Sequence, residues 1–391
     1  MRFHLANIIQ LFFVKFSKLF RSHKIEAFEA IMILAISHAY GCFNPKQLAD
    51  LLGVSHQKIY TEISSWTLYK LRKVLKLMMI NVAVEQLQII EQKSIVTQSR
   101  ANITLAVDDS VIDRVGKRLR CTWNWYSGRW KKVVNGQNIL GIILTIKGKA
   151  IPIGLIFCSK QGRKNTNKPS ILVGMLRQIK EECLKENIDI TKYPITLDSW
   201  YASKELKEQL SELGFTKIIM AGKGSYVFEG ENFKGKGSEG QKRVDYQENQ
   251  WGIDVPCVRQ KLSNPTFGTL NLLFFQKSNS NCYLLIDLSS ISLRGAEIWR
   301  TWTAHNIIEQ FWKILKSVLK IAEMKLRKQG IYTGLLIKII MYLMLLSIQF
   351  MANFRRLSLT QIMRKIQSST RLTDVIKEHF QQDFLGISAI V

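Results

Sequence analysis

The sequence predicts an α/β protein: a mixed sheet with a β-rich insertion, preceded by a helical region and followed by helices. Three observations predict this fold class. Apolar residues recur at helical spacing in the first hundred residues, β-type runs alternate with helical segments from residue 102 to 221, and the chain becomes helical again after residue 286. With 47% apolar and 22% charged residues, the 391-residue chain has a globular composition and room for two or three domains.

The stretch 44–63 has the residue pattern that a helix-turn-helix requires. Ala49 is small enough for two helices to approach, Gly53 can form the turn, and Ile59 can pack the second helix on the first. Ser55 stands where it can N-cap the second helix. Two packed helices without a DNA role are the alternative interpretation. If the pair is a DNA-binding helix-turn-helix, the side chains available to the groove are His56, Gln57, Lys58 and Tyr60.

The central segment predicts a mixed sheet, because apolar β-type runs are separated by both turns and helices. The expected strands are 103–107, 138–146, 150–158, 193–197 and 216–220, and the expected helices are 168–186 and 203–213. The segment 222–282 is different: it is Gly-rich at its start, basic, and carries short β-type runs. We therefore expect a β-rich insertion there, followed by a further strand at 283–286.

The charge balance points to a polyanionic partner. Lys and Arg number 56 against 30 Asp and Glu, which gives a formal net charge of +26. Nucleic acid is the first candidate partner, an anionic membrane surface is the second, and a generally basic proteome is the simplest alternative. The six cysteines form no C-x-x-C motif and no zinc-type spacing with histidine, which favours reduced thiols in a cytoplasmic protein.

The most apolar run, 335–351, is close to the length that spans a membrane. Lys338 and Gln349 lie inside it, and we expect a buried core helix rather than a transmembrane one. A membrane-associated protein centred on this run is the hypothesis that this expectation opposes.

Acidic residues follow two of the predicted strands, at the sheet edge where α/β proteins bind ligands. Asp108 and Asp109 end the first strand, and Asp198 follows the strand 193–197. Neighbouring residues on a strand point to opposite faces, so only one of the first two can face a shared site. Each of these residues, taken singly, could also be an ordinary turn or cap residue.

A helix starting near Trp299 supplies a third carboxylate. On an ideal helix Glu309 shares one polar stripe with Trp302, His305, Lys313 and Lys316, opposite an apolar face. An ordinary amphipathic helix with a Glu309–Lys313 pair is the alternative, although two solvent-facing tryptophans are uncommon without a binding partner. Three carboxylates brought together in a basic protein favour Mg²⁺ or Mn²⁺ and phosphodiester chemistry with two metal ions.

With these residues in place, the chain resembles bacterial insertion-sequence transposases of the DDE type. The similar subgroup has a ribonuclease-H-like catalytic domain interrupted by a β-rich insertion between its second Asp and its Glu. Asp109 in LAVDDS, Asp198 in ITLDSWY and Glu309 in NIIEQFWKILK match the three acids, and the resemblance covers about 102–348. Asp198 follows Asp109 by 89 residues, and Glu309 follows Asp198 by 111, which leaves room for the insertion.

The subgroup also carries a Tyr-Arg-Glu-Lys signature around its Glu. Here the corresponding residues are Trp302, His305, Glu309 and Lys316, so Glu and Lys match while Trp and His depart from the pattern. In the family the Tyr and Arg hold DNA near the transposon end. A Trp can still stack, whereas a neutral His cannot make the bidentate phosphate contact of Arg.

The resemblance implies a cytoplasmic, nucleoid-associated prokaryotic DNA transposase that acts on double-stranded DNA at the ends of its element and at the target, without a membrane. It implies catalysis and metal binding by Asp109, Asp198 and Glu309 with two Mg²⁺ ions, which Mn²⁺ can replace, and a homodimer in the DNA complex. The alternative is a catalytically inactive DNA-binding regulator derived from a transposase. The expected segments are a helical DNA-binding region at 1–100, catalytic parts at 101–221 and 283–350, the insertion at 222–282 and a helical tail at 351–391.

Overall fold

A computed structural model describes most of the chain from residue 41 to 368. The described ranges are 41–53, 55–64, 67–97, 102–113, 119–128, 130–158, 168–231, 233–243, 253, 255–278, 281–324, 326, 330–351 and 354–368, with parts of 14–22 and 34–38. The chain forms two compact units. The first comprises 1–82, 111–138 and 311–391, and the second comprises 83–110 and 139–310. Most of the expected helical tail, from residue 369 on, lies outside the described residues.

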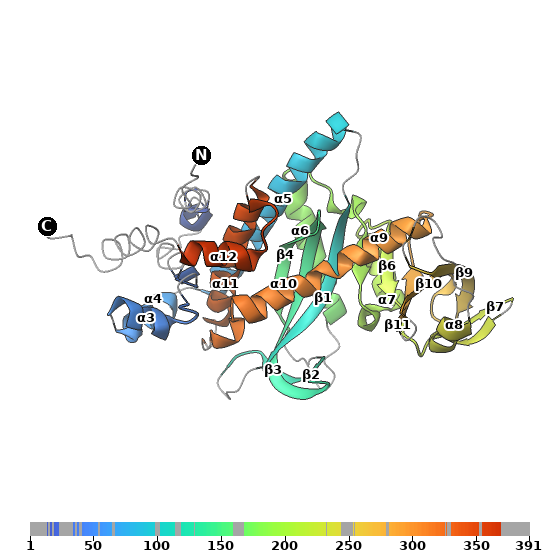
Figure 1. The fold of residues 1–391 in the computed structure, drawn as a ribbon, viewed down its shortest axis with the longest axis horizontal. Coiled ribbons are helices and arrows are strands. Elements are labelled where there is room, and N and C mark those ends of the chain that lie inside the picture. Colours follow the sequence, from blue (N-terminus) through green and yellow to red (C-terminus); the bar gives the residue numbers. More distant parts are fainter. Residues whose placement is uncertain are drawn as a thin grey trace. The chain divides into compact units, whose positions relative to one another are not determined.

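The second unit is built on a mixed sheet, as the sequence predicts (Figure 1). Its strands are ordered β3-β1-β5-β6-β11-β10-β9-β7-β8, with β4 paired to β3. The β1–β5 and β5–β6 pairs are parallel, whereas β3–β4, β6–β11 and the pairs beyond β11 are antiparallel. The strand bounds are β1 Ile103–Asp113, β3 Lys132–Ile146, β4 Lys149–Phe157, β5 Ile195–Leu197, β6 Ile218–Ala221, β7 Val227–Gly230, β8 Phe233–Lys236, β9 Cys257–Asn264, β10 Gly268–Ser278 and β11 Asn281–Asp287.

Helices α6 (Lys168–Leu184), α7 (Lys204–Glu212) and α9 (Gly295–His305) belong to the same unit, where α6 packs on β4 and α9 packs on β5. Gly154 allows the approach of α6, because a Cβ at this position would lie 2.9 Å from Ile179 Cδ1. The hydroxyl of Ser203 caps α7 by accepting from the Leu206 amide, and Gly214, with φ +100°, follows its end. Both boundaries of α7 agree with the prediction.

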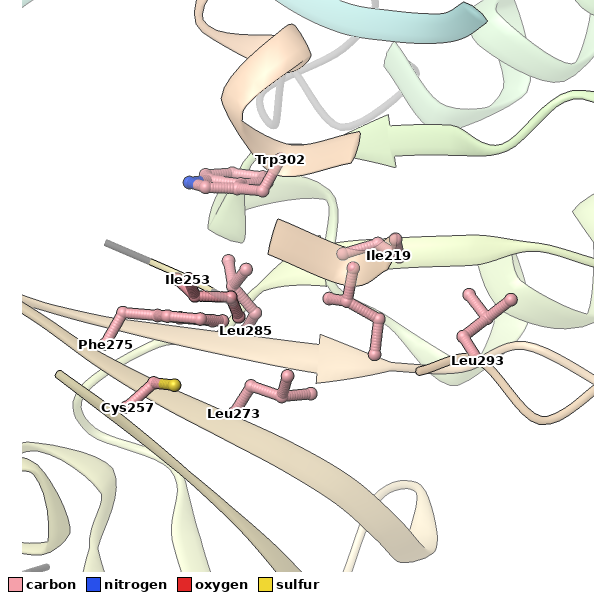
Figure 2. Close-up of a cluster of buried hydrophobic side chains, with 9 residues drawn as sticks. Ile219, Ile253, Cys257, Leu273, Phe275, Leu285, Leu293 and Trp302 are labelled. Carbon is pink, nitrogen blue, oxygen red and sulfur yellow. The ribbon is translucent and has the colours of Figure 1, made fainter. Parts of the chain in front are cut away.

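The β-rich segment continues the main sheet instead of forming a separate one. Strand β11 pairs with β10 on one side and with β6 on the other, so β7, β8, β9 and β10 extend the sheet beyond β6. A short helix, α8 (Gly237–Arg243), follows β8. One apolar core joins these strands to α9, and Figure 2 shows Trp302 with strand residues such as Phe275 and Leu285 in this cluster.

The first unit is mainly helical in its described part. It contains α3 (Pro45–Leu52), α4 (His56–Ser64), the start of α5 (Leu68–Thr97), the strand β2 (Thr122–Ser127), α11 (Gly330–Phe350) and α12 (Leu359–Gln367). The first two helices follow the predicted pattern. Gly53 adopts a left-handed conformation between them, and the side chains of Ala49 and Ile59 are buried. The Ser55 hydroxyl accepts from the Gln57 amide at 3.3 Å, as an N-cap does. A DNA role for this pair stays a prediction.

Helix α11 is long and apolar enough to cross a membrane. Its most apolar 18 residues have a mean hydropathy of 2.0, but 94% of this stretch is buried inside the protein. Its one lysine is buried too. The ammonium of Lys338 donates to the Phe43 carbonyl at 3.0 Å and lies 5.4 Å from the centre of the Phe43 ring. Burial and the charge of Lys338 hold the pKa of His38 well below its usual value. This helix therefore has the packing of a core helix.

Candidate active site

Asp109 lies in a contact network that sequence reasoning did not predict. One carboxylate oxygen, Oδ2, lies 2.8 Å from the ammonium of Lys168 at the start of α6. The other, Oδ1, accepts a hydrogen bond of 2.9 Å from the hydroxyl of Tyr201. The ion pair is sheltered, because the side chains of Lys168 and Asp109 are 9% and 17% exposed. Both oxygens of the expected first catalytic acid thus have cationic or protic partners.

The parallel pairing of β1 with β5 creates this network. In the register Val107 lies opposite Leu197, so Asp198 leaves β5 beside the acidic part of β1. The carboxylate of Asp198 then accepts from the Ser199 amide at 2.6 Å and caps a 3-10 turn, Ser199–Tyr201. The turn ends at Tyr201, whose phenol donates to the carboxylate of Asp109. The DSWY segment therefore connects the two predicted aspartates through its tyrosine.

Tyr201 is held in its protonated form. Burial, followed by the neighbouring charge of Asp109, raises its pKa well above the usual value. The phenol consequently acts as a hydrogen-bond donor to the carboxylate over the whole physiological pH range. The adjacent Trp200, a residue that is 45% exposed, contacts Tyr201 edge-on, and the ammonium of Lys168 lies over its ring, 4.7 Å from the ring centre.

Asp109 is not at the end of its strand. The prediction ended the strand at Val107, but β1 continues to Asp113, and Asp108 and Asp109 lie within it. The sequence signal was misleading because the polar run Asp-Asp-Ser resembles a strand end. The extended strand nevertheless carries Asp109 past the end of β5, where Tyr201 can reach it.

The expected polar stripe on one continuous helix is wrong. Helix α9 ends at His305, α10 (Ile307–Lys313) begins after Asn306, and a π-helical turn covers Ile314–Val318. Trp302 and His305 are each only 6% exposed, whereas Glu309 is exposed. The physical reason is packing, because Trp302 belongs to the apolar core of β6, β10 and β11.

His305 makes an internal contact instead of facing solvent. Its Nδ1 lies 2.9 Å from the Thr196 hydroxyl, and its ring stacks on Trp302 at 4.5 Å with an interplanar angle of 7°. Thr196 also lies 3.1 Å from the Leu105 carbonyl, to which its hydroxyl donates; His305 then carries its proton on Nδ1. Burial lowers the pKa of His305 to about 4, so the ring is neutral at physiological pH. This chain of contacts links α9 to β5 and β1, the strands that position the aspartates.

Carboxylate oxygen is the donor that Mg²⁺ prefers, so the residue types of the predicted trio suit this ion. Their arrangement in this conformation does not, because no three His, Cys, Asp or Glu side chains in the described part of the chain are grouped so that they could hold a metal ion. Asp198 and Glu309 are exposed, and Asp109 already pairs with Lys168. A three-carboxylate metal site stays a prediction.

The other predicted DNA contacts lie in the first unit. Lys313 is exposed and Lys316 is half-buried, while His56 and Gln57 are exposed on α4. The side chain of Lys58 lies outside the described residues. A DNA role for these five residues stays a prediction.

A cleft of about 620 Å³ lies at the junction of α9 and α10 in the second unit. None of the described residues that line it carries a carboxylate. Its polar and aromatic lining suits an anionic ligand, a feature that the sequence pattern did not indicate because the residues come from four separate segments. The polar and aromatic residues of this lining include Lys147, Trp299, Arg300, Thr303, Asn306 and Gln310.

Comparison with known proteins gives few matches. No family model matches the chain, and no curated protein matches it. Among solved structures, the chain is similar to a piggyBac transposase in a synaptic complex with hairpin DNA, at 15% sequence identity and a TM-score of 0.37. The alignment covers 73% of this chain and 59% of that chain, so this chain spans less than two thirds of the structure that it matches.

Proposed function

We propose that this protein is a DNA transposase of the DDE type. The observation that carries the proposal is the contact between Tyr201 and Asp109, 2.9 Å apart. It brings the segment that begins with Asp198 to the carboxylate of Asp109, as a site built from these two acids requires. Glu309 belongs to the second unit, like Asp109 and Asp198, and its side chain is exposed.

In this proposal the protein binds the terminal inverted repeats of its own element. It hydrolyses a phosphodiester there, which leaves a free 3′-hydroxyl, and that hydroxyl then attacks a target phosphodiester and displaces a target 3′-hydroxyl. Asp109, Asp198 and Glu309 are the residues that would hold Mg²⁺. The bound ions would supply charge stabilisation for the attacking and leaving oxygens. A homodimer that holds two ends and a cytoplasmic, nucleoid-associated location complete the proposal.

The residues of this chain have separate roles within this scheme. Tyr201 orients the Asp109 carboxylate by donating to Oδ1, and Lys168 balances its charge while no other cation is present. His305 and Thr196 act as positioning residues, because they fix α9 to the strand that precedes Asp198. The basic cleft between α9 and α10 offers a place for a DNA phosphate, with Lys147 and Arg300 as its cations.

DNA recognition is assigned to the first unit, with His56, Gln57 and Lys58 of α4 presented to the groove. The left-handed Gly53 between α3 and α4 supports this assignment, because a helix-turn-helix needs a turn at this point. Lys313 and Lys316 supply phosphate contacts, which the net charge of +26 supports. Trp302 and His305 are buried, so we propose for them an internal role in place of the DNA contact first expected.

The test is end cleavage by the purified full-length protein. A duplex carrying the DNA that flanks the gene is incubated with Mn²⁺ and one protein at a time. The proteins are wild type, Asp109→Asn, Asp198→Asn and Glu309→Gln. We expect the three variants to lose cleavage by at least a hundredfold while retaining binding to the duplex. Glu208→Gln, which removes an exposed acid from α7, is the matched control and should cleave normally. Cleavage that survives in all three variants would refute the site.

The second candidate function is a catalytically inactive DNA-binding regulator. The ion pair of Lys168 with Asp109 favours it, because the pair occupies a carboxylate that catalysis needs. The same assay separates the two functions. Wild-type protein that binds the ends tightly and never cleaves them, with either Mg²⁺ or Mn²⁺, would identify the regulator.

A further inference from the structure

The cleft at the junction of α9 and α10 has the size of a small-molecule site. Its volume of about 620 Å³ falls within the range of roughly 300–1,000 Å³ that such sites occupy. The helical part of its lining recurs at intervals of four, three and four residues, the spacing of one helix face: Trp299, Thr303, Asn306 and Gln310. Asn102, just before β1, and Lys147, in the turn between β3 and β4, add to this lining.

Two contacts hold parts of this lining in place. The ring of Trp299 stacks on Phe275 of β10, with the ring centres 4.4 Å apart and the planes at 27°. The side-chain amide of Asn102 donates to the Arg300 carbonyl at 3.2 Å, which ties the start of β1 to α9. A ligand therefore meets an aromatic ring and a backbone that are already ordered, which lowers the entropy cost of binding.

The charge of the described lining is positive. Lys147 and Arg300 are its charged residues; both are exposed, and neither is ion-paired within the described part of the chain. Two acids adjoin lining residues in the sequence. Glu309 is exposed and does not line the cleft, and Asp254 lies outside the described residues. A lysine and an arginine side by side suit a phosphate group, which accepts hydrogen bonds from both.

The uncharged part of the lining suits a flat ring with polar edges. Trp299 supplies aromatic surface, and Ile253 adds apolar surface from the core that Figure 2 shows around Phe275. The amides of Asn306 and Gln310 each carry a donor and an acceptor, the combination that pairs with the edge of a nucleobase. A sugar phosphate alone would leave this half of the cleft unused, and an uncharged ring would leave the two cations unused.

We propose that this cleft binds a nucleotide through both its base and its phosphate. The base packs on the Trp299 ring with the amides at its edge, and Lys147 and Arg300 hold the phosphate. The proposal deepens the proposed function, which places only a phosphate in the cleft, and it rests on that function where the nucleotide belongs to DNA. An unpaired nucleotide of a DNA strand and a free nucleotide share this chemistry.

The test is isothermal titration calorimetry of the full-length protein, without metal ions, with three ligands. These are AMP, adenosine, which lacks the phosphate, and ribose 5-phosphate, which lacks the base. We expect AMP to bind most tightly, because it alone uses both halves of the cleft. Lys147→Gln with Arg300→Gln should weaken AMP binding roughly tenfold or more, through the loss of charge-assisted hydrogen bonds, and change adenosine binding by less than about twofold.

A second set of variants tests the base. Trp299→Leu should weaken AMP binding roughly tenfold, as the loss of one base–aromatic contact predicts, and leave ribose 5-phosphate binding unchanged, which also shows that this variant is folded. Trp299→Phe keeps a ring and should stay within about threefold of wild type. The matched control is Arg177→Gln with Lys185→Gln, two exposed cations of the same unit outside the cleft, and it should bind all three ligands normally.

Competition against bound AMP identifies the source of the nucleotide. Displacement by a 20-nucleotide oligo(dA), but not by an abasic strand of the same length, identifies an unpaired nucleotide of DNA. AMP that stays bound in excess oligo(dA) identifies a free nucleotide.

Three results would overturn the proposal: wild type that does not bind AMP, AMP that binds no more tightly than ribose 5-phosphate, or an unaltered AMP affinity in the Lys147 and Arg300 double variant. None of these readouts depends on cleavage. A failed cleavage assay therefore refutes the proposed function and leaves AMP binding undisturbed, whereas a failed AMP titration removes the nucleotide from the cleft and leaves catalysis undisturbed.

Discussion

The ammonium of Lys168 lies 2.8 Å from Oδ2 of Asp109, in a pair whose side chains are largely sheltered from solvent. The remaining oxygen of Asp109 accepts from Tyr201, so each carboxylate oxygen already has a partner. A divalent cation that binds Asp109 must compete with the ammonium for the same negative charge. Lys168 should thus oppose metal binding at this carboxylate.

Replacing Lys168 by Gln should therefore tighten the binding of Mn²⁺ to the protein. Removing a competing positive charge within 3 Å of the ligand oxygen favours the metal, and we expect a dissociation constant roughly tenfold lower, about 1.4 kcal/mol. The measurement is titration of free Mn²⁺ by electron paramagnetic resonance, which needs no DNA. Lys185→Gln removes an exposed lysine of the same unit and is the control. An unchanged or weaker Mn²⁺ affinity in Lys168→Gln would contradict this role.

Tyr201→Phe should destabilise the protein by about 1.5–3 kcal/mol, because a partly buried carboxylate loses a charge-assisted hydrogen bond. Urea unfolding at pH 7 measures the change in free energy. Tyr226→Phe is the comparison, since its hydroxyl donates at 2.7 Å to the neutral carbonyl of Ala202 and its loss should amount to about 1 kcal/mol. Equal losses in the two variants would show that the charge of Asp109 adds nothing to the bond.

His305 should make stability fall as the pH is lowered from about 6.5 to about 4. Its pKa in the folded protein is about 4, below the value of about 6.5 for an unfolded chain, so the unfolded state binds the extra proton in this window. The contribution of His305 is complete above pH 6.5 and falls by up to roughly 3 kcal/mol near pH 4.

Urea unfolding of wild type and His305→Gln at pH 7 and pH 4.5 isolates this effect, because other titrating groups, including His38, are common to both proteins. The free energy of unfolding of wild type should exceed that of His305→Gln by less at pH 4.5 than at pH 7. A constant difference at both pH values would mean that the pKa of His305 is not lowered in the folded protein.

Gly136→Ala should destabilise the protein by about 2–4 kcal/mol, because the new Cβ would lie 2.5 Å from the Ile112 carbonyl oxygen and the strands would have to separate. Gly174→Ala is the opposite case. Gly174 lies in α6 with open space around its missing Cβ, so alanine should stabilise by about 0.5–1 kcal/mol. Thermal unfolding of both variants checks the pair, and a harmless Gly136→Ala would show that β1 and β3 can move apart freely.

Much of the fold follows from local sequence patterns. The β3–β4 hairpin was predicted from two apolar runs around Lys147 and Gly148, and both residues adopt the positive φ that a tight turn needs. The ends of α7 followed from Ser203 and Gly214. These features depend on neighbours in the chain, which is why a pattern can predict them.

The candidate site was predicted only in part, because its contacts are tertiary. Asp109 and Asp198 could be chosen from their places after apolar runs, but the partners Lys168 and Tyr201 have no pattern that ties them to Asp109. The break at Asn306 has no Gly or Pro to signal it. The burial of Trp302 and His305 was equally hidden from the pattern, because it depends on packing against strands distant in the chain.

The hydrogen bonding of β11 to β6 has a mechanical consequence. The inserted strands are joined to the central sheet by hydrogen bonds between strands as well as by the chain, because β10 pairs with β11 and β11 pairs with β6. We therefore expect a molecule that displaces β7 to β10 to displace β11, β6 and β5 as well, and Asp198 directly follows β5.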